Sequence, residues 1–293
     1  MTTSPQHQHV HQQHHAHDSH EHDGDLTELL DLDADVLTGY LTDVVGWLPV
    51  ATPPRRILDL GTGTGGGAFA LLDRFPDASV TAVDVSAAYL QRVREKAEAR
   101  GLGERVRTVQ ADLDGDWPDL GTPDLVWSSA AIHHLADPDR GLRAIRDLLT
   151  RGGLFALVEL ADFPRFLPAD APAERPGLED RWHEVTARSH ADRVPHLGSD
   201  WGPRLVEAGF ELAGERAVTV DIDGNVASGG DEVLGRYALA TIRRVRETVG
   251  ADLDPADLAA IDRLLDVDGP GSIMRRHDLA VHTERQVWAA LRR

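Results

Sequence analysis

The stretch RILDLGTGTGGG, residues 56–67, decides the fold. Its apolar part, Ile57–Leu60, predicts a short buried strand, and the glycines that follow predict a tight loop that opens a helix through Leu72. Glycine lets the backbone approach a ligand closely, and the first turn of a helix points free N–H groups at it. The stretch therefore predicts a ligand site between a strand and a helix.

Strands and helices alternate on both sides of this loop. Further strands are expected at 79–85, 106–111, 124–129 and 154–160, with helices at about 86–100 and 137–149. Alternation of this kind is typical of a parallel sheet that is covered by helices on both faces. Ahead of the loop, apolar residues at helical spacing from Asp33 to Leu48 predict an N-terminal helical segment over residues 25–52.

The alternation stops after residue 160. Residues 161–198 are rich in proline, charge and aromatic side chains and too long for an ordinary connection, so we expect a lid or substrate wall there. A helix over 203–209, a strand over 211–222, two further helices and a closing strand over 278–291 follow. We therefore assign residues 53–222 and 278–293 to one core and residues 223–277 to a helical insert.

Three aspartates stand at the ends of the first three predicted strands. Asp59 lies just before the glycine loop, Asp84 closes the second strand and Asp112 follows the third. Ligands of open α/β sheets bind at the carboxyl ends of the strands, and a carboxylate at the end of the second strand can accept both hydroxyls of a ribose. Gly61, Gly63 and Gly66 also fit the G-x-G-x-x-G pattern of dinucleotide-binding folds, so a nicotinamide-dependent oxidoreductase stays an alternative.

Five pieces of sequence occur together in this order: ILDLGTGTG, VTAVDVS, VQADL, DLVWSSAAIHHL and LLTRGGLFALVEL. On these pieces, residues 55–160 resemble a class I S-adenosylmethionine-dependent methyltransferase of the small-molecule, ubiquinone/menaquinone-methyltransferase-like type. The resemblance implies a Rossmann-like three-layer α/β sandwich. Its mostly parallel sheet would have seven strands, preceded by N-terminal helices and with a helical insert before the last strand.

The resemblance also implies S-adenosylmethionine as cofactor and a role for each matching residue. Asp59 and the loop residues Gly61, Thr62, Gly63 and Gly65 would hold the methionine end of the cofactor. Asp84 would bind the ribose, and Val85 would lie against the adenine. Asp112 would accept a hydrogen bond from the adenine amino group beside Leu113, and Ser128 would offer its backbone carbonyl to the amino-acid moiety.

A base is needed only when the acceptor must lose a proton. His133 and His134, which follow the fourth strand, are the candidates, and a structural or cofactor-positioning role for them is the alternative. Rival candidates in or near the lid are His183, His190, His196 and Glu159. Phe163, Phe166, Trp182 and Trp201 could line a substrate pocket or anchor the lid to the core, and the arginines at 236, 243, 244 and 246 could meet an anionic substrate, a second subunit or only solvent.

Composition restricts the remaining functions. The 293-residue chain has no cysteine, which excludes disulfides, iron–sulfur clusters and thiol nucleophiles, and its net charge of −19 argues against a nucleic-acid partner. No apolar run reaches the roughly 20 residues of a membrane-spanning helix, so we expect a cytoplasmic protein without a membrane partner. Eight of the 15 histidines lie within residues 7–22 of a tail, residues 1–24, that we expect to be disordered.

These observations favour an S-adenosylmethionine-dependent methyltransferase acting on oxygen, nitrogen or carbon of a small molecule, with no metal in the core and a homodimer as one possible assembly. Two alternatives to this enzyme remain open beside the oxidoreductase. The chain could bind S-adenosylmethionine without catalysis, or the histidine-rich tail could loosely bind divalent metal ions.

Overall fold

The computed structural model describes residues 26–224 and 231–293 and contains one seven-stranded sheet in the order β3-β2-β1-β4-β5-β7-β6. Strands β1 to β5 are parallel, and β7 runs antiparallel to both of its neighbours. The strands are β1 (Arg56–Leu60), β2 (Ser79–Asp84), β3 (Val106–Gln110), β4 (Leu125–Ser129), β5 (Leu154–Leu160), β6 (Phe210–Asp223) and β7 (Ala280–Arg292). The predicted α/β fold and its seven strands are confirmed.

The helices begin where the sequence supplies a side-chain cap. Ser86, Asp137, Asp200 and Asp254 each accept a hydrogen bond from a backbone N–H of the first turn that follows. The helices are α2 (Thr38–Trp47), α3 (Gly66–Arg74), α4 (Ala87–Ala99), α5 (Pro138–Leu148), α6 (Leu178–Arg193), α7 (Trp201–Glu207), α8 (Asp231–Val249) and α9 (Pro255–Leu265). Residues 26–36 are also helical, so the predicted N-terminal segment contains two helices.

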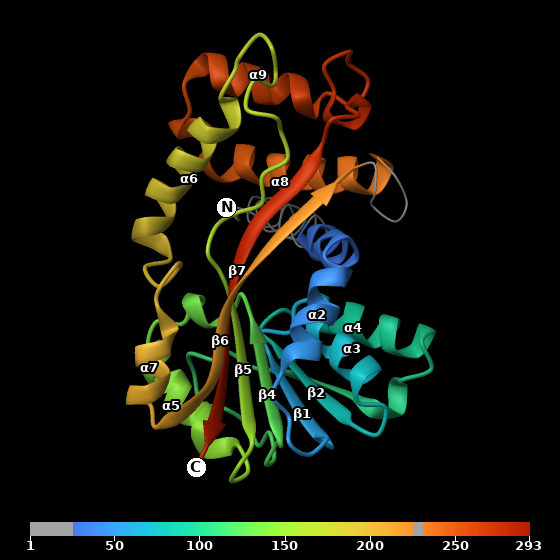
Figure 1. Ribbon diagram of the computed structural model, residues 1–293. Coiled ribbons are helices and arrows are strands. Elements are labelled where there is room, and N and C mark those ends of the chain that lie inside the picture. The colour runs from blue at the N-terminus through green and yellow to red at the C-terminus, as the bar shows by residue number, and fades with distance from the viewer. Residues whose placement is uncertain (1–25, 225–230) are drawn as a thin grey trace, which may run out of the picture.

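Helices cover both faces of the sheet, as Figure 1 shows: α2, α3 and α4 lie on one side, and α5 and α7 lie on the other. Each face has its own apolar core. Trp127 and Phe69 belong to the core on the α3 side, whereas Phe155 and Trp201 belong to the core on the α5 side. The strands are therefore buried on both faces, which explains the continuous apolar runs in the sequence.

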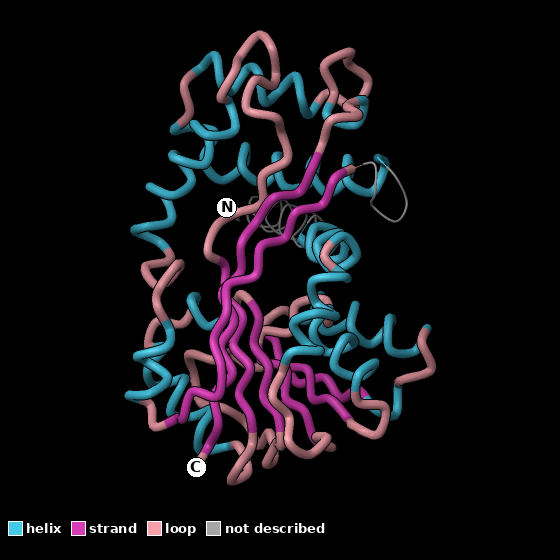
Figure 2. Tube along the Cα trace, in the orientation of Figure 1, coloured by secondary structure: helices cyan, strands magenta, loops and turns pink. Residues whose placement is uncertain are grey.

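The β6–β7 hairpin extends well beyond the other strands (Figure 2), and α6, α8 and α9 gather around its far end. A third apolar core forms there. It joins Trp182 of α6, Tyr237 of α8, Ile261 of α9, Val281 of β7 and Leu37, which comes just before α2. The lid, the insert and the N-terminal helices therefore share one core above the carboxyl ends of the parallel strands.

Two further observations concern the whole described part of the chain. None of its helices combines the length and the apolar character that crossing a membrane requires. Nor do residues 26–224 and 231–293 contain a group of three or more histidine, aspartate or glutamate side chains arranged to hold a metal ion. The histidine-rich tail over residues 1–24 lies outside the described residues.

Candidate active site

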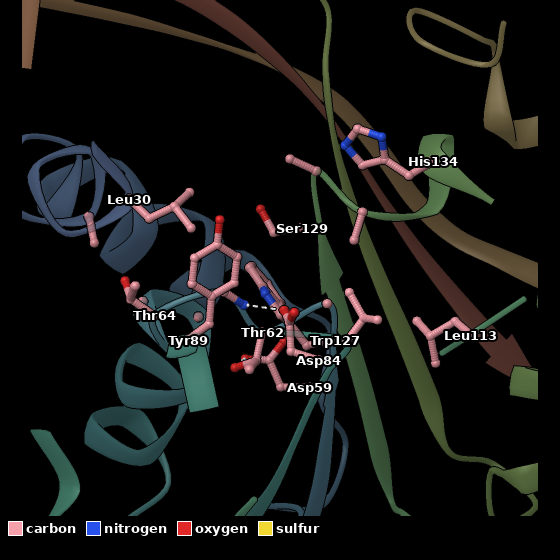
Figure 3. A pocket seen from close by; sticks show the side chains of 18 of the residues that line it. Leu30, Asp59, Thr62, Thr64, Asp84, Tyr89, Leu113, Trp127, Ser129 and His134 are labelled. Carbon is pink, nitrogen blue, oxygen red and sulfur yellow. Dashed lines mark hydrogen bonds between the residues drawn. The ribbon is translucent and has the colours of Figure 1, made fainter. Parts of the chain in front are cut away.

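A cavity of about 600 Å³ opens at the carboxyl ends of β1, β2 and β4, a volume typical of small-molecule sites. Figure 3 shows Asp59, Asp84 and Trp127 at its floor, with Leu30 and His134 on opposite sides. The side chains and loops that line it include Leu30, Asp33, Asp59, Gly61, Thr62, Gly63, Asp84, Val85, Asp112, Leu113, Trp127, Ser129 and His134.

The glycine loop is held to the neighbouring strand by its own backbone. The N–H groups of Gly61 and Thr62 both donate to the carbonyl of Val83, at 2.9 and 3.0 Å. Gly61 has a φ of +68°, and a Cβ at this position would lie 2.3 Å from the Cβ of Ala131. Glycine is therefore required at residue 61 both by the left-handed backbone and by the close approach of the loop that follows β4.

Asp59 is a buried carboxylate beside this loop, with only 2% of its surface exposed. Its Oδ2 accepts a hydrogen bond from the Thr62 hydroxyl at 2.7 Å, and no ion pair joins it to a basic residue in the part of the chain that the structure describes. Burial, reinforced by the nearby charge of Asp84, raises the pKa of Asp59 to about 7. A carboxylate of this kind would be stabilised by a cationic ligand group in the cavity.

Asp84 ties the end of β2 to the glycine loop and to the start of α4. Its Oδ2 accepts from the Gly63 N–H and its Oδ1 from the Ser86 N–H, each at 2.9 Å. Each carboxylate oxygen can accept a further hydrogen bond, and Asp84 lines the cavity. The next residue, Val85, is 64% exposed, which is unusual for a large apolar side chain and leaves it available to a flat ligand.

Asp112 and Leu113 line the same cavity from the loop after β3. The Oδ1 atom of Asp112 accepts from the Asp114 N–H at 2.9 Å, which fixes the carboxylate within a turn. The Leu113 carbonyl in turn accepts from the Trp117 indole N–H at 2.9 Å. Three carboxylates predicted from the sequence, those of residues 59, 84 and 112, thus meet at one cavity.

The N-terminal helix over residues 26–36 closes one side of the cavity, a contribution that the sequence analysis missed. Asp31 of this helix pairs with Arg92 at 2.7 Å and with Lys96 at 2.5 Å, both from α4. Lys96, the only lysine of the chain, also donates to the Thr64 carbonyl of the glycine loop at 3.2 Å. Burial alone would raise the pKa of Asp31, but hydrogen bonds from Lys96, Thr64 and Arg92 lower it.

The two histidines after β4 have different surroundings. His133 is 3% exposed and its Nδ1 is hydrogen-bonded to Oε2 of Glu159, while Oε1 of Glu159 accepts from the Ile132 and His133 N–H groups. Neither side chain lines the cavity. His133 and Glu159 therefore form a buried pair behind the cavity that holds the turn Ile132–His134, and their predicted roles as base and substrate contact stay predictions.

His134 is the histidine that faces the cavity (Figure 3). Its ring lies 4.2 Å from that of His133, measured between centroids. Desolvation by the surrounding protein, together with the nearby His133 and His190, lowers the pKa of His134 to about 4. The imidazole is therefore neutral near pH 7 and can accept a hydrogen bond from a ligand.

Two residues predicted to touch the cofactor lie just behind the cavity wall. Ser128 is fully buried and its hydroxyl donates to the Leu60 carbonyl at 2.9 Å, so Ser129, which follows it, lines the cavity instead. Gly65 caps α3 with a φ of +89°, and a Cβ there would meet Phe69 and Val93. Ser128 and Gly65 are not among the residues that line the cavity. Their predicted cofactor contacts, of which that of Ser128 uses the backbone carbonyl and not the hydroxyl, stay predictions.

Two of the aromatic residues left open between lining a substrate pocket and anchoring the lid, Trp182 and Trp201, lie in apolar cores. Trp182 is buried in the apolar core of the insert, and Trp201 is buried between α7 and the sheet. His196 lies beside Arg204, which reaches its Nδ1 at 3.3 Å, and does not line the cavity. The position of the two tryptophans therefore favours the anchoring role, since a large aromatic ring contributes most when it is fully buried.

His183 of α6 is also absent from the cavity lining. Its Nε2 is buried without a hydrogen-bond partner among the described residues. Burial and the nearby charge of Arg165 lower its pKa to about 4. Three of the α8 arginines meet acidic neighbours, Arg236 with Glu28 at 2.6 Å, Arg244 with Glu247 at 3.8 Å and Arg246 with Asp262 at 2.8 Å.

Comparison with known families identifies the part of the chain that carries this cavity. Residues 57–153 match a family model described as a methyltransferase domain. This region is a methyltransferase domain. The class I resemblance read from residues 55–160 is thereby confirmed, and the glycine loop, Asp59, Asp84 and Asp112 all fall inside the matched region.

Relatives of the methyltransferase domain include enzymes with different acceptors. The malonyl-[acyl-carrier protein] O-methyltransferase of Halorhodospira halophila is 38% identical over 165 residues, which are 55% of this chain and 50% of that protein. The demethylmenaquinone methyltransferase of Thermus thermophilus is 38% identical over 40% of this chain and 53% of its own. The chain thus spans about half the length of the curated relatives it matches.

Solved structures extend the likeness of fold beyond the methyltransferase domain. A crystal structure from Bacillus halodurans C-125, of a protein named as a candidate methyltransferase, superposes on 86% of this chain and 98% of its own. The TM-score is 0.53 at 18% sequence identity. The YcgJ protein of Bacillus subtilis covers 87% of this chain and 99% of its own, with a TM-score of 0.50 at 15% identity.

Proposed function

We propose that the protein transfers a methyl group from S-adenosylmethionine to a small-molecule acceptor by in-line displacement. The observation that carries this proposal is the buried carboxylate of Asp59, which has no basic partner among the described residues and lies beside the glycine loop at the cavity. A site that holds an uncompensated carboxylate in this position suits a ligand with a cationic amino-acid end.

The remaining lining residues fit the rest of that cofactor. Asp84 would accept the two ribose hydroxyls, Val85 and Leu113 would lie against the adenine, and Asp112 would accept from its amino group. When bound, S-adenosylmethionine supplies an electrophilic methyl group on a sulfonium, and the thioether is the leaving group. The protein's share of the work is alignment of the acceptor and exclusion of water, which can contribute roughly 7–11 kcal/mol in well-oriented systems.

His134 is the residue that would touch the acceptor. Its neutral imidazole can accept the proton of an acceptor hydroxyl or hold that hydroxyl in line with the methyl group. His133 and Glu159 act through His134, since their buried pair fixes the turn that presents it. We therefore assign His134 as the candidate catalytic residue and His133 and Glu159 as positioning residues.

The relatives' names suggest that the acceptor is chosen outside the matched domain. Proteins named for malonyl-[acyl-carrier protein], demethylmenaquinone and trans-aconitate all share residues of this domain with the chain. The same cofactor half can therefore serve unlike acceptors. Selection of the acceptor would fall to the lid, the insert and the β6–β7 hairpin.

The proposal is tested by isothermal titration of the full chain with S-adenosylhomocysteine, the product form of the cofactor. We expect binding, and we expect Asp84→Ala to weaken it by at least about tenfold, since charge-assisted hydrogen bonds contribute roughly 1.5–3 kcal/mol. Asp77→Asn, an exposed aspartate at the opposite end of β2, is the matched control. Absence of binding to the wild-type protein, or binding of a nicotinamide dinucleotide in its place, would refute the proposal.

A further inference from the structure

The connection between β3 and β4 forms part of the cofactor cavity although it has no regular structure. Residues 111–124, all of which the structure describes, contain neither helix nor strand. Connections of roughly 12–15 residues without secondary structure are uncommon in compact domains unless they have a function. Asp112 and Leu113, the residues proposed to contact the adenine, lie at the start of this connection and line the cavity. Their placement therefore depends on contacts that the rest of the chain makes with the connection.

Arg140, in the first turn of α5, makes the most of these contacts. Its Nη1 donates to the Gly115 carbonyl at 3.2 Å. Its Nη2 donates to the carbonyls of Leu113 and Asp114, at 3.4 and 2.5 Å. One guanidinium thus holds three successive backbone carbonyls, a task that suits the rigid fork of arginine better than the single ammonium of lysine.

The start of α5 is itself held in place, so it is a firm support for the loop. Asp137 caps the helix by accepting from the Arg140 N–H at 2.9 Å. A second contact joins the loop to the same part of the chain, since Oδ1 of Asp114 accepts from the Ala136 N–H at 2.9 Å. The loop is therefore bound to the segment that directly follows the cavity residue His134.

The carbonyls that Arg140 binds belong to the turn that orients the Asp112 side chain. The Asp112 carbonyl accepts from the Gly115 N–H at 3.1 Å, and its Oδ1 accepts from the Asp114 N–H at 2.9 Å. Asp112 is exposed, so the packing of a core does not fix its direction. The direction of its carboxylate follows from the shape of the turn.

We propose that Arg140 is a positioning residue for nucleobase recognition, because it holds the 112–115 turn that orients Asp112 toward the amino group of adenine. This inference rests on the proposed function and names the residue that makes the cavity prefer adenine to a purine with an oxygen in place of that amino group. A carboxylate accepts a hydrogen bond from an amino group, whereas a carbonyl oxygen offers it no proton. Arg140 is not among the described residues that line the cavity, so it acts on the ligand only through the turn.

The test compares two ligands by calorimetric titration of the full chain. They are S-adenosylhomocysteine and S-inosylhomocysteine, in which an oxygen replaces the purine amino group. The wild type should bind the adenosyl ligand at least about tenfold more tightly, the effect of one hydrogen bond to a charged group. Arg140→Met, which keeps the length of the side chain but removes its donors, should reduce this ratio to about one- to threefold by weakening the adenosyl ligand. Arg143→Met, an exposed arginine one turn further along α5, should change neither affinity.

Three further variants separate positioning from a loss of stability. Asp112→Ala should lower the ratio as far as Arg140→Met does, and the double variant should lower it no further, because both act through one contact. Arg140→Lys retains the charge but not the fork, so it should also lower the ratio. Asp84→Ala should weaken both ligands equally, since the ribose is the same in each.

The ratio of the two affinities, and not the thermal midpoint, decides the outcome. Equal weakening of both ligands in Arg140→Met would mean that Arg140 only stabilises the loop, and would overturn the inference. So would a wild-type ratio near one, or a ratio that Arg140→Met leaves unchanged. Failure of the wild type to bind S-adenosylhomocysteine at all would refute the proposed function, and this inference with it.

Discussion

The two halves of the active site are built on different principles. The cofactor half is assembled from residues that directly follow β1, β2, β3 and β4, so each contact is recorded locally in the sequence beside an apolar strand. The proposed acceptor half would be assembled from the turn Ile132–His134, the lid, the insert and the β6–β7 hairpin, which lie far apart in the sequence (Figure 1). The cofactor half can therefore be shared among many enzymes, whereas the acceptor half can change without disturbing it.

The largest loss of cofactor affinity is expected at Gly61, where the glycine loop leaves no space for a side chain. Gly61→Ala would place a Cβ 2.3 Å from that of Ala131 on a backbone with φ +68°, so the loop must move away from the cavity. Left-handed strain of roughly 1–2 kcal/mol and overpacking of roughly 1–3 kcal/mol together predict a loss of S-adenosylhomocysteine affinity of about a hundredfold. Calorimetric titration measures it.

Gly101→Ala is the matched control for that substitution. Gly101 has the same φ of +68°, but a Cβ there would meet nothing within 4 Å. It should cost some stability and leave cofactor affinity unchanged. Equal losses of affinity in the two variants would show that cofactor binding responds to general destabilisation and not to the close approach of Gly61 to Ala131. The proposed difference between the two halves of the site would then lose its support.

The next effect separates cofactor binding from acceptor chemistry. His134→Ala removes the one histidine of the described residues that lines the cavity, so methyl transfer should fall by about tenfold to a hundredfold or more while S-adenosylhomocysteine affinity stays the same. Because its pKa is lowered to about 4, the wild-type rate should show no inflection near pH 6.5. The rate of S-adenosylhomocysteine release between pH 5 and 8, measured with an acceptor found by screening small phenols, amines and carboxylates, tests both statements.

His133→Asn provides the comparison for His134→Ala. Its partner Glu159 holds the backbone of the same turn, so loss of the pair should lower the thermal midpoint as well as the rate. A rate loss in His133→Asn without any loss of stability would mean that the buried histidine takes part in the chemistry, and that the assignment of the two histidines is reversed.

The sequence predicted most of the strand-end and loop residues that line the cavity, but little of how the rest of the chain packs over it. Asp84 and Asp112 could be located because each stands at the end of an apolar run whose period identifies a strand. The contact of Tyr237 with Asp33 leaves no such pattern in the sequence, since it depends on how α8 and the N-terminal helix meet in space. The sequence left Trp182 and Trp201 open between two roles for the same reason, because composition cannot tell a ring that lines a site from one that fills a core.

A third prediction links stability to function at Asp59. The folded protein holds a proton on this carboxyl up to about pH 7, whereas the unfolded chain releases it near pH 4, so stability falls as the pH rises between these values. Asp59→Asn removes the charge and should raise the thermal midpoint at pH 8 but not at pH 4, while weakening S-adenosylhomocysteine by about tenfold or more. Differential scanning calorimetry at both pH values measures these midpoints, with Asp77→Asn as the control. An equal change in the midpoint of Asp59→Asn at pH 4 and at pH 8 would contradict the prediction.

The smallest loss of S-adenosylhomocysteine affinity is expected where the two halves of the site meet, at the ion pairs between the N-terminal helix and α4. Lys96 pairs with Asp31 and also donates to the Thr64 carbonyl, so Lys96→Met removes the link between the N-terminal helix and the glycine loop. The ion pair of Asp31 with Arg92 remains. Because the Asp31–Arg92 ion pair still holds the N-terminal helix, S-adenosylhomocysteine affinity should fall by only about three- to tenfold. Hydrogen exchange in residues 26–36 should quicken at the same time, since the helix is held less firmly over the cavity.

Arg94→Met on the same helix removes a cation that bonds to Thr108 and Gln91 instead, so it should change neither quantity. A loss of affinity in Lys96→Met without faster exchange in residues 26–36 would place the effect in the glycine loop alone. The N-terminal helix would then belong to the acceptor half, because it still contacts the insert through the hydrogen bond that Asp33 accepts from Tyr237 of α8.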